Sequence, residues 1–374
     1  MPLTFDEELR YSRHLVLPGV GVRGQERLKQ ARVLLVGAGG LGSPVALYLA
    51  AAGVGTLGIV DDDVVDVTNL QRQVLHRTAN AGKAKVESAA EALAQLNPLT
   101  HVVPLHTRLT TGNASEIIAE YDVVIDGTDN FPARYLLNDA CALARKPLVF
   151  GSIFRFEGQV AVFDAARGPC YRCLFPAPPP PSSVPTCAEG GVLGVLPGLI
   201  GMIQAAETLK LLLEAGSPLL GRLLLCDALE MRFREVRIGK NPDCPLCGEA
   251  PTIHTLQAYD EFCGVPAQRT PDAAWELTPA QVREMFPPES IRWVDVREEW
   301  EYDETPGMPG ALHIPYPAFA RRMHELDSAA TLVIYCSQGI RSWHAAALLH
   351  RAGFMRAWSV KGGLNSLLES YPMT

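Results

Sequence analysis

The sequence predicts an α/β protein with a doubly wound first domain and a smaller α/β second domain. Short, continuously apolar runs alternate with helical patterns in the first half, which indicates parallel strands covered on both faces. A glycine-rich turn follows the first apolar run, as expected where such a sheet binds a ligand. A second series of apolar runs begins near Trp275. We place the domains at residues 1–250 and 273–374, with a linker at 251–272.

The expected elements follow in chain order. The apolar runs expected to form strands are 32–37, 56–61, 122–126, 147–150, 292–296 and 331–336. The helical patterns are at 41–52 and 342–352. The most apolar stretch, 192–213, contains glycine, proline and charged residues, so we expect a buried helix rather than a membrane span. The proline run within 176–185 is expected to be an exposed crossing segment.

Composition narrows the classes of function. The net charge of −8 argues against a general nucleic-acid or membrane-surface binder. The first residues show neither a basic nor an apolar segment of the kind that begins a signal peptide. Nine cysteines is an odd number, and the spacing of four of them is that of a metal site. We therefore expect a protein of the reducing cytoplasm.

Two C-x-x-C fragments about seventy residues apart indicate a metal site. Each fragment places two thiolates on one tight turn, and four thiolates make the tetrahedral set of a structural zinc ion. The alternative, four unrelated cysteines, is less economical because two such pairs rarely arise separately. The predicted ligands are Cys170, Cys173, Cys244 and Cys247.

A Rossmann-like nucleotide site is predicted at the first glycine-rich turn. Its glycines let backbone N–H groups approach a phosphate at the start of a helix. Asp61 ends the next strand, where a carboxylate can hold a ribose hydroxyl. Taken alone, this pattern is most typical of a dinucleotide dehydrogenase. The glycines are Gly37, Gly39, Gly40 and Gly42.

Polar residues around this turn favour a triphosphate instead. Arg13, Asn69, Arg72 and Lys85 supply cationic or amide donors, and Asp129 follows a strand, where a carboxylate can hold Mg²⁺. Three of these residues have a plainer interpretation. Lys85 could be a surface charge, Arg72 could pair with the acidic run 61–63, and Asp129 could be a helix N-cap.

Residues 1 to about 250 resemble the MoeB/ThiF branch of the ubiquitin-activating enzyme family. The resemblance is carried by residues 10–13, 37–42, 69–73, 82–86, 127–130 and 186–189, and by both cysteine pairs. It implies ATP-dependent adenylation of the C-terminal Gly-Gly of a ubiquitin-like sulfur carrier, of the type used for molybdopterin, thiamine or tRNA thiolation.

The same resemblance implies roles for single residues. Lys85 and Arg72 would neutralise the polyphosphate, Asp129 would bind Mg²⁺, and Asp61 would hold the ribose. Arg13 would reach the phosphates of a neighbouring subunit, which implies a homodimer. Asp63, Asn69 and Asn130 complete the predicted nucleotide site.

A second reactive position is predicted at Cys336, where an apolar strand runs into a helix. Loop N–H groups and the positive end of the helix dipole stabilise a thiolate or persulfide there. The plainer alternative is a small buried hydrophobe. Residues 275–374 resemble a single rhodanese domain through 295–297, 310–315, 336–341 and 360–365.

The rhodanese resemblance implies that Cys336 carries a persulfide and that Arg341 attracts an anionic donor or holds the loop. One common rhodanese pattern has a basic residue directly after the cysteine, where this chain has Ser337. Thiosulfate and the persulfide of a cysteine desulfurase are therefore both open as donors. Cys187, after the proline run, is a candidate for accepting the carrier through a thioester or disulfide.

Together these observations predict an adenylyltransferase and sulfurtransferase that uses ATP, Mg²⁺ and a structural zinc ion. Three alternatives remain: a dinucleotide oxidoreductase, a thiosulfate sulfurtransferase with a non-catalytic first domain, and a non-catalytic binder of a ubiquitin-like fold. Neither nucleic acid nor membrane is expected as a partner.

Overall fold

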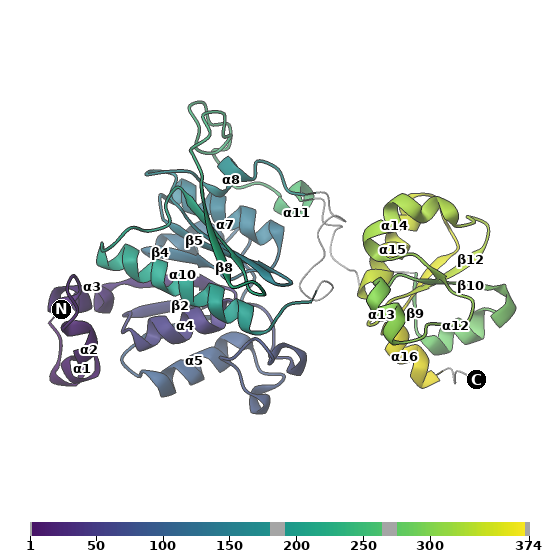
Figure 1. The fold of residues 1–374 in the computed structure, drawn as a ribbon, viewed down its shortest axis with the longest axis horizontal. Helices are drawn as coiled ribbons and strands as arrows, with labels where there is room; N and C mark the ends of the chain where they lie inside the picture. Colours follow the sequence, from purple (N-terminus) through teal and green to yellow (C-terminus); the bar gives the residue numbers. More distant parts are fainter. Residues whose placement is uncertain (1, 180–190, 264–274, 371–374) are drawn as a thin grey trace. The chain divides into compact units, whose positions relative to one another are not determined.

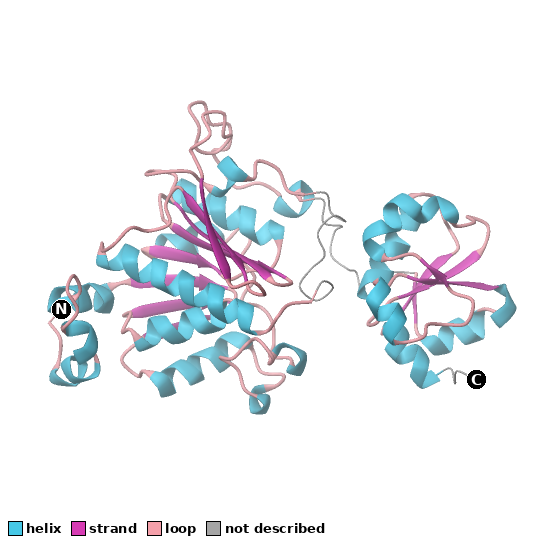
Figure 2. Cartoon of the chain, in the orientation of Figure 1, coloured by secondary structure: helices cyan, strands magenta, loops and turns pink. Residues whose placement is uncertain are grey.

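The computed structural model describes residues 2–179, 191–263 and 275–370. The chain divides into two compact units (Figure 1). Among the described residues, 2–179 and 191–263 form the first unit and 275–370 form the second. Helices and strands make up both units (Figure 2).

The first unit is built on an eight-stranded sheet of order β3-β2-β1-β4-β5-β6-β7-β8. The strands from β3 to β5 are parallel, and those from β5 to β8 are antiparallel. The bounds are β1 Arg32–Val36, β2 Thr56–Val60, β3 His101–Leu105, β4 Val123–Asp126, β5 Leu148–Phe154, β6 Glu157–Phe163, β7 Arg222–Asp227 and β8 Arg232–Arg237.

Two apolar cores explain why the parallel strands lack polar alternation. Val33 and Leu35 of β1 face one core, whereas Leu34 and Val36 face the other. Helices α4, α5 and α10 cover the first face, and α6, α7 and α11 cover the second. The predicted doubly wound fold is confirmed. The helix bounds are α1 Phe5–Arg10, α2 Ser12–Leu15, α3 Gly21–Gln30, α4 Gly42–Ala51, α5 Lys85–Leu96, α6 Ala114–Ala119, α7 Phe131–Ala144, α8 Tyr171–Leu174, α10 Val195–Leu213 and α11 Tyr259–Phe262.

Helix α10 lies within the most apolar stretch of the sequence, 192–213, for which a buried helix is predicted. By length and composition it is the one helix of the described chain able to span a membrane. It packs on α4, β5 and β6, with Leu196, Ile200 and Gln204 buried. Its apolar character therefore has a use in the core, as predicted.

The second unit holds a five-stranded parallel sheet of order β11-β10-β12-β13-β9. Two apolar cores lie on its faces. The strands are β9 Glu276–Leu277, β10 Ile291–Asp295, β11 Leu312–His313, β12 Thr331–Tyr335 and β13 Ala357–Val360. The helices are α12 Pro279–Met285, α13 Glu299–Glu304, α14 Tyr316–Arg322, α15 Ile340–Arg351 and α16 Gly363–Ser370.

Part of the predicted linker belongs to the first unit. Within 251–272, α11 packs against α7, and both Tyr259 and Cys263 are buried in the core on that side of the sheet. Residues 264–272 lie outside the described residues. The domain boundaries themselves stay a prediction.

Candidate functional site

The glycine-rich turn lies where the strand order of the first sheet reverses. Strand β1 pairs with β2 on one side and with β4 on the other, so the loops after β1 and β4 leave the sheet in opposite directions. Ligands of doubly wound folds bind outside the carboxyl ends of the strands at such a point. The predicted residues of the turn and those after β4 therefore meet at one edge.

Two of the four predicted glycines are required by close backbone contacts. Gly37 has a φ of +97°, and a Cβ there would lie 2.5 Å from the carbonyl oxygen of Gly127. A Cβ on Gly42 would lie 2.0 Å from the carbonyl oxygen of Gly37. Any side chain at either position would displace the backbone of the turn.

Asp61, after β2, is tied to the turn. Its Oδ2 accepts a hydrogen bond from the Ala38 N–H at 2.8 Å, and its Oδ1 accepts from the Asp63 N–H at 2.9 Å. Burial raises the pKa of Asp61, an effect that the Lys85 charge opposes. Each oxygen keeps a second lone pair with which it can accept a ribose hydroxyl.

His76 contacts the same turn through a hydrogen bond to the backbone of Ala38, and it was not predicted from the sequence. Its Nε2 lies 2.9 Å from the Ala38 carbonyl oxygen, and its Nδ1 lies 3.0 Å from Ser88 Oγ. A carbonyl only accepts, so Nε2 carries the proton and Nδ1 accepts from the serine hydroxyl. Burial lowers the pKa of His76, which favours this neutral ring.

Lys85 begins α5 and is not a solvated surface charge. Its side chain is buried, and Nζ donates to Asp63 Oδ2 at 2.8 Å. The Asp63 side chain is 70% exposed, so one face of the pair is open to an incoming anion.

The 69–73 segment also lies against the turn. Gln73 Nε2 donates to Asn69 Oδ1 at 2.8 Å, and it lies 3.6 Å from where a Cβ on Gly39 would be. Arg72 Cδ lies 3.5 Å from the corresponding position on Gly40. Arg72 and Asn69 are thus placed beside the glycines, as the sequence motif suggested.

At the end of β4, Asn130 rather than Asp129 is the N-cap of α7. Asn130 Oδ1 accepts from the Ala133 N–H at 3.0 Å, which leaves the exposed Asp129 carboxylate free of that role. The buried Asp126 accepts from the Thr128 N–H and hydroxyl through Oδ1 and lies 3.5 Å from Arg134 Nε through Oδ2.

The described structure does not test the roles predicted for two residues. Arg13 is exposed on α2, and its predicted reach into a neighbouring subunit concerns a second chain. Cys187 lies outside the described residues.

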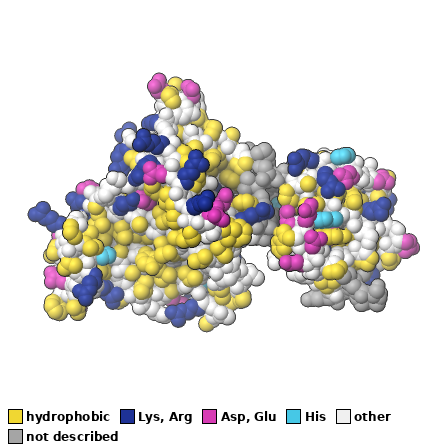
Figure 3. Space-filling view, viewed as in Figure 1, with side chains coloured by type: hydrophobic (Ala, Val, Ile, Leu, Met, Phe, Trp, Pro, Cys, Tyr) yellow, Lys and Arg dark blue, Asp and Glu magenta, His cyan; other side chains and the backbone are white. Residues whose placement is uncertain are grey.

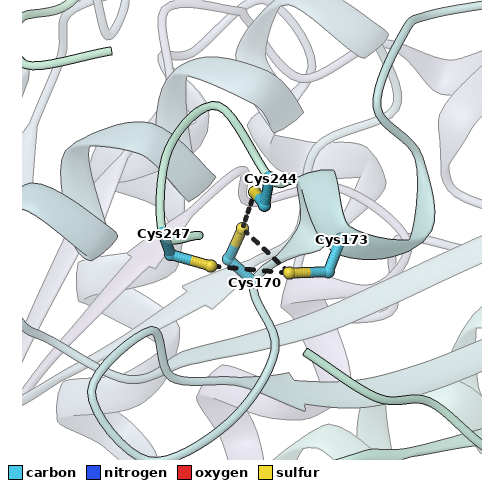
Figure 4. A group of neighbouring side chains, drawn as sticks. All are labelled: Cys170, Cys173, Cys244 and Cys247. Atoms are coloured by element: carbon cyan, nitrogen blue, oxygen red, sulfur yellow. Dashed lines mark hydrogen bonds between the residues drawn. The ribbon is translucent and has the colours of Figure 1, made fainter. Parts of the chain in front are cut away.

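The four predicted zinc ligands converge in one cluster (Figure 4). The Sγ–Sγ distances are 3.9 Å for Cys170–Cys173, 3.6 Å for Cys170–Cys244 and 3.4 Å for Cys173–Cys247. A tetrahedral ion with Zn–S bonds of about 2.3 Å separates its sulfurs by about 3.8 Å. The donor set and spacing therefore fit zinc, and four thiolates leave no open position for a substrate.

The thiol of Cys336 lies in a tight loop between β12 and α15. The side chain is 1% exposed, and Sγ accepts from the Gly339 N–H at 3.1 Å. Ser342 Oγ lies 3.8 Å from the same sulfur and 2.9 Å from Ser359 Oγ. The loop thus directs the Gly339 N–H at the sulfur and keeps the sulfur away from solvent.

Arg341, four residues after Ser337, is held by an acidic residue that the sequence analysis missed. Its guanidinium makes a bidentate ion pair with Glu301 of α13, at 2.5 and 2.7 Å. Ser337 Oγ also donates to Glu301, at 2.6 Å. The acidic first turn of α13 was visible in the sequence, but nothing there singles out Glu301 among its neighbours.

Comparison with known proteins supports both halves of this arrangement. The ThiF family model matches residues 11–246, and the Rhodanese-like domain model matches residues 278–370. The chain is 47% identical over 371 residues to the probable adenylyltransferase/sulfurtransferase MoeZ of Mycobacterium tuberculosis, spanning 97% of this chain and 93% of that protein. These matches confirm the two predicted family resemblances.

Other relatives match one or both units. The sulfur carrier protein adenylyltransferase of Thermus thermophilus is 55% identical over 270 residues, which is 71% of this chain and all of that protein. The adenylyltransferase and sulfurtransferase MOCS3 of Sus scrofa is 50% identical over 328 residues, 86% of this chain and 72% of that one. The solved structure of Escherichia coli MccB with MccA-N7isoASN has a TM-score of 0.58 over 64% of this chain and 74% of that chain; at 23% identity it is similar in fold alone.

Proposed function

The chain belongs to the ThiF family and carries a rhodanese-like domain, and we propose that it adenylates a ubiquitin-like sulfur carrier and then transfers sulfur to it. The observation that carries the proposal is that one chain combines two sites. A glycine turn with Asp61 and Lys85 lies at the switch point of the first sheet. A loop whose Gly339 N–H donates to the sulfur of Cys336 lies in the second unit.

In the first step, a carboxylate oxygen of the carrier's C-terminal glycine attacks the α-phosphorus of ATP and pyrophosphate leaves. Such a displacement needs positioning and charge neutralisation more than a protein nucleophile. We assign neutralisation to Lys85 and Arg72, the ribose to Asp61, and Mg²⁺ to Asp129. Asp63, Asn69, Asn130 and the glycine turn complete the nucleotide site.

In the second step, the terminal sulfur of a Cys336 persulfide attacks the acyl-adenylate carbonyl carbon and AMP leaves. The product is an acyl disulfide joined to Cys336. Attack by a second thiolate on the Cys336 sulfur releases the carrier thiocarboxylate and leaves a protein disulfide, which a thiol reductant reopens. Cys187 stays the candidate for accepting the carrier itself, through a thioester or a disulfide.

Several further assignments accompany this proposal. Zinc held by the four-cysteine cluster is structural and joins the segment that follows β6 to the segment that follows β8. A homodimer is supported by exposed apolar side chains over α4 and α10 (Figure 3), among them Tyr48, Val195 and Met202. A cytoplasmic location fits the four cysteines of the cluster, which form no disulfide with one another.

The test is ATP–pyrophosphate exchange by the full-length protein with small carriers of its own organism, each intact or without its terminal Gly-Gly. Exchange that needs one intact carrier supports the first step and names the partner. Asp129→Ala should abolish exchange while Cys336 still loads sulfur, and Cys336→Ala should do the reverse. Glu116→Gln, at an exposed carboxylate of α6, is the control. Absence of exchange with every carrier, from folded protein that loads Cys336, would refute adenylation.

A further inference from the structure

The Glu301 carboxylate joins two polar side chains of the Cys336 loop, those of Ser337 and Arg341. Oε2 accepts from Arg341 Nη1, whereas Oε1 accepts from both Arg341 Nη2 and Ser337 Oγ. Arg341 Nη2 also lies 3.4 Å from Ser337 Oγ. One carboxylate on α13 thus fixes the residue directly after the cysteine and the only arginine within 336–341.

This ion pair is largely withdrawn from solvent. The side chains of Arg341 and Glu301 are 8% and 13% exposed. Burial opposes ionisation of Glu301, but hydrogen bonds from Arg341 and Ser337 outweigh it and lower its pKa to about 2. The pair is therefore ionised at neutral pH, and its two charges cancel at the loop that holds Cys336.

The surroundings of the pair are acidic. Helix α13 also carries Glu299, Asp303 and Glu304, and acidic side chains gather over it in Figure 3. A donor with two negative charges gains nothing from a neutralised guanidinium and is repelled by the remaining carboxylates. Releasing Arg341 to bind such a donor would leave the largely buried Glu301 without its counter-charge.

We propose that Glu301 is a specificity-determining residue that selects against thiosulfate, so that Cys336 accepts its sulfur from a persulfide donor. With thiosulfate, the Cys336 thiolate attacks the outer sulfur, the S–S bond breaks and sulfite leaves with its electron pair. With a persulfide, R–S–SH, the thiolate attacks the outer sulfur, R–S⁻ leaves, and the proton passes to that thiolate. This inference rests on the proposed sulfur transfer and names its donor class.

The experiment compares the full-length protein with Glu301→Gln, whose side chain keeps the shape and the hydrogen-bonding capacity toward Ser337. Thiosulfate is one donor, and a cysteine desulfurase supplied with cysteine is the other. Loading is read as one added sulfur atom on Cys336 by mass spectrometry, and KM and kcat are measured with cyanide as acceptor. Pyrophosphate exchange is measured in parallel as a check on the first unit.

For Glu301→Gln we expect the KM for thiosulfate to fall by about tenfold or more, equivalent to about 1.4 kcal/mol. We expect kcat and loading by the desulfurase to stay within about twofold, since the sulfur itself is untouched. Adding Arg341→Met to Glu301→Gln should remove the gain. Glu289→Gln, at an exposed position outside α13, is the matched control and should change KM little.

Three outcomes would overturn the inference. An unchanged KM for thiosulfate in Glu301→Gln, with normal desulfurase loading, would show that the ion pair does not discriminate between donors. Equal losses with both donors would show a purely structural role. A gain that persists without Arg341 would assign the effect to another cation. If the unaltered protein loaded from neither donor while exchange proceeded, the proposed sulfur transfer itself would fall.

Discussion

Replacing Asp139 should destabilise the first unit more than any other single change at a polar residue near the cysteine cluster. Arg172 lies between Cys170 and Cys173, and its guanidinium donates to both Asp139 carboxylate oxygens at 2.8 Å. Tyr259 of α11 donates to the same carboxylate at 2.8 Å. The Asp139 side chain is 0% exposed and that of Arg172 is 1% exposed.

The magnitude follows from this burial. Asp139→Asn keeps the size of the side chain but leaves the Arg172 charge buried without its counter-ion, which costs about 3–5 kcal/mol. Cation–π contacts of the guanidinium with the rings of Tyr135 and Phe262, at 4.9 and 4.7 Å, recover only part of this. Tyr259→Phe removes one hydrogen bond to a charged group and should cost about 1.5–3 kcal/mol.

The assay is urea unfolding of the zinc-loaded protein, followed on the transition of the first unit. Hydrogen exchange of residues 256–263 reports whether α11 loosens. Adding Arg172→Met to Asp139→Asn should restore part of the loss, because the unpaired charge is gone. Glu116→Gln again serves as control. A cost below about 1 kcal/mol for Asp139→Asn, typical of an exposed ion pair, would refute the reasoning.

Three further predictions concern the first unit. Cys173→Ser should lower the bound zinc and the temperature of unfolding, measured by metal analysis and calorimetry, whereas unchanged zinc would contradict the cluster assignment. The folded-state pKa of His76 is lowered, so its contribution to stability is present above its unfolded pKa of about 6.5 and is lost as pH falls toward the folded value. His76→Gln should therefore make the urea midpoint of unfolding depend less on pH in that window. Gly42→Ala should abolish pyrophosphate exchange because its Cβ would lie 2.0 Å from the Gly37 carbonyl oxygen, whereas Gly198→Ala, with no atom within 4 Å, should not.

The parallel part of the fold was predictable because strands that are buried on both faces have continuously apolar sequences. Strand β1 is apolar at every position from Val33 to Val36, since successive side chains enter different cores. The glycine turn and the cysteine pairs were predictable for a similar reason. Each depends on residue types at fixed short spacing, and few alternatives satisfy the same geometry.

The two edge strands of the first sheet, β3 and β8, were harder to predict from the sequence. Strand β8 is largely exposed along its whole length, so its sequence lacks the apolar alternation that indicates a half-buried strand. Strand β3 contains Pro104 and is also partly exposed. Both strands owe their place to pairing with better-marked neighbours, β7 and β2, and not to their own patterns.

The residues that support the two sites could not be predicted from the sequence, because their partners are distant along the chain. Glu301 and Arg341 are 40 residues apart, and His76 and Ala38 are 38 apart. No local spacing connects such pairs. A glutamate in an acidic helix start and a histidine in a polar segment each have common, unremarkable interpretations, so only the tertiary contacts single them out.

Each of the two sites contains a cation paired with a carboxylate. The burial of that carboxylate decides whether an incoming anion can displace it from the cation. In the first unit, Lys85 is buried but Asp63 is 70% exposed, so the carboxylate keeps its contact with water while it is paired. A polyphosphate can therefore take Lys85 from Asp63, which returns to water at little cost. In the second unit, Glu301 is 13% exposed and bound through both oxygens, so an anion that took Arg341 would leave a carboxylate stranded. We therefore expect Lys85 to bind an anionic substrate and Arg341 to stay paired with Glu301 and hold the Cys336 loop. In the sequence, both are cations near a reactive position.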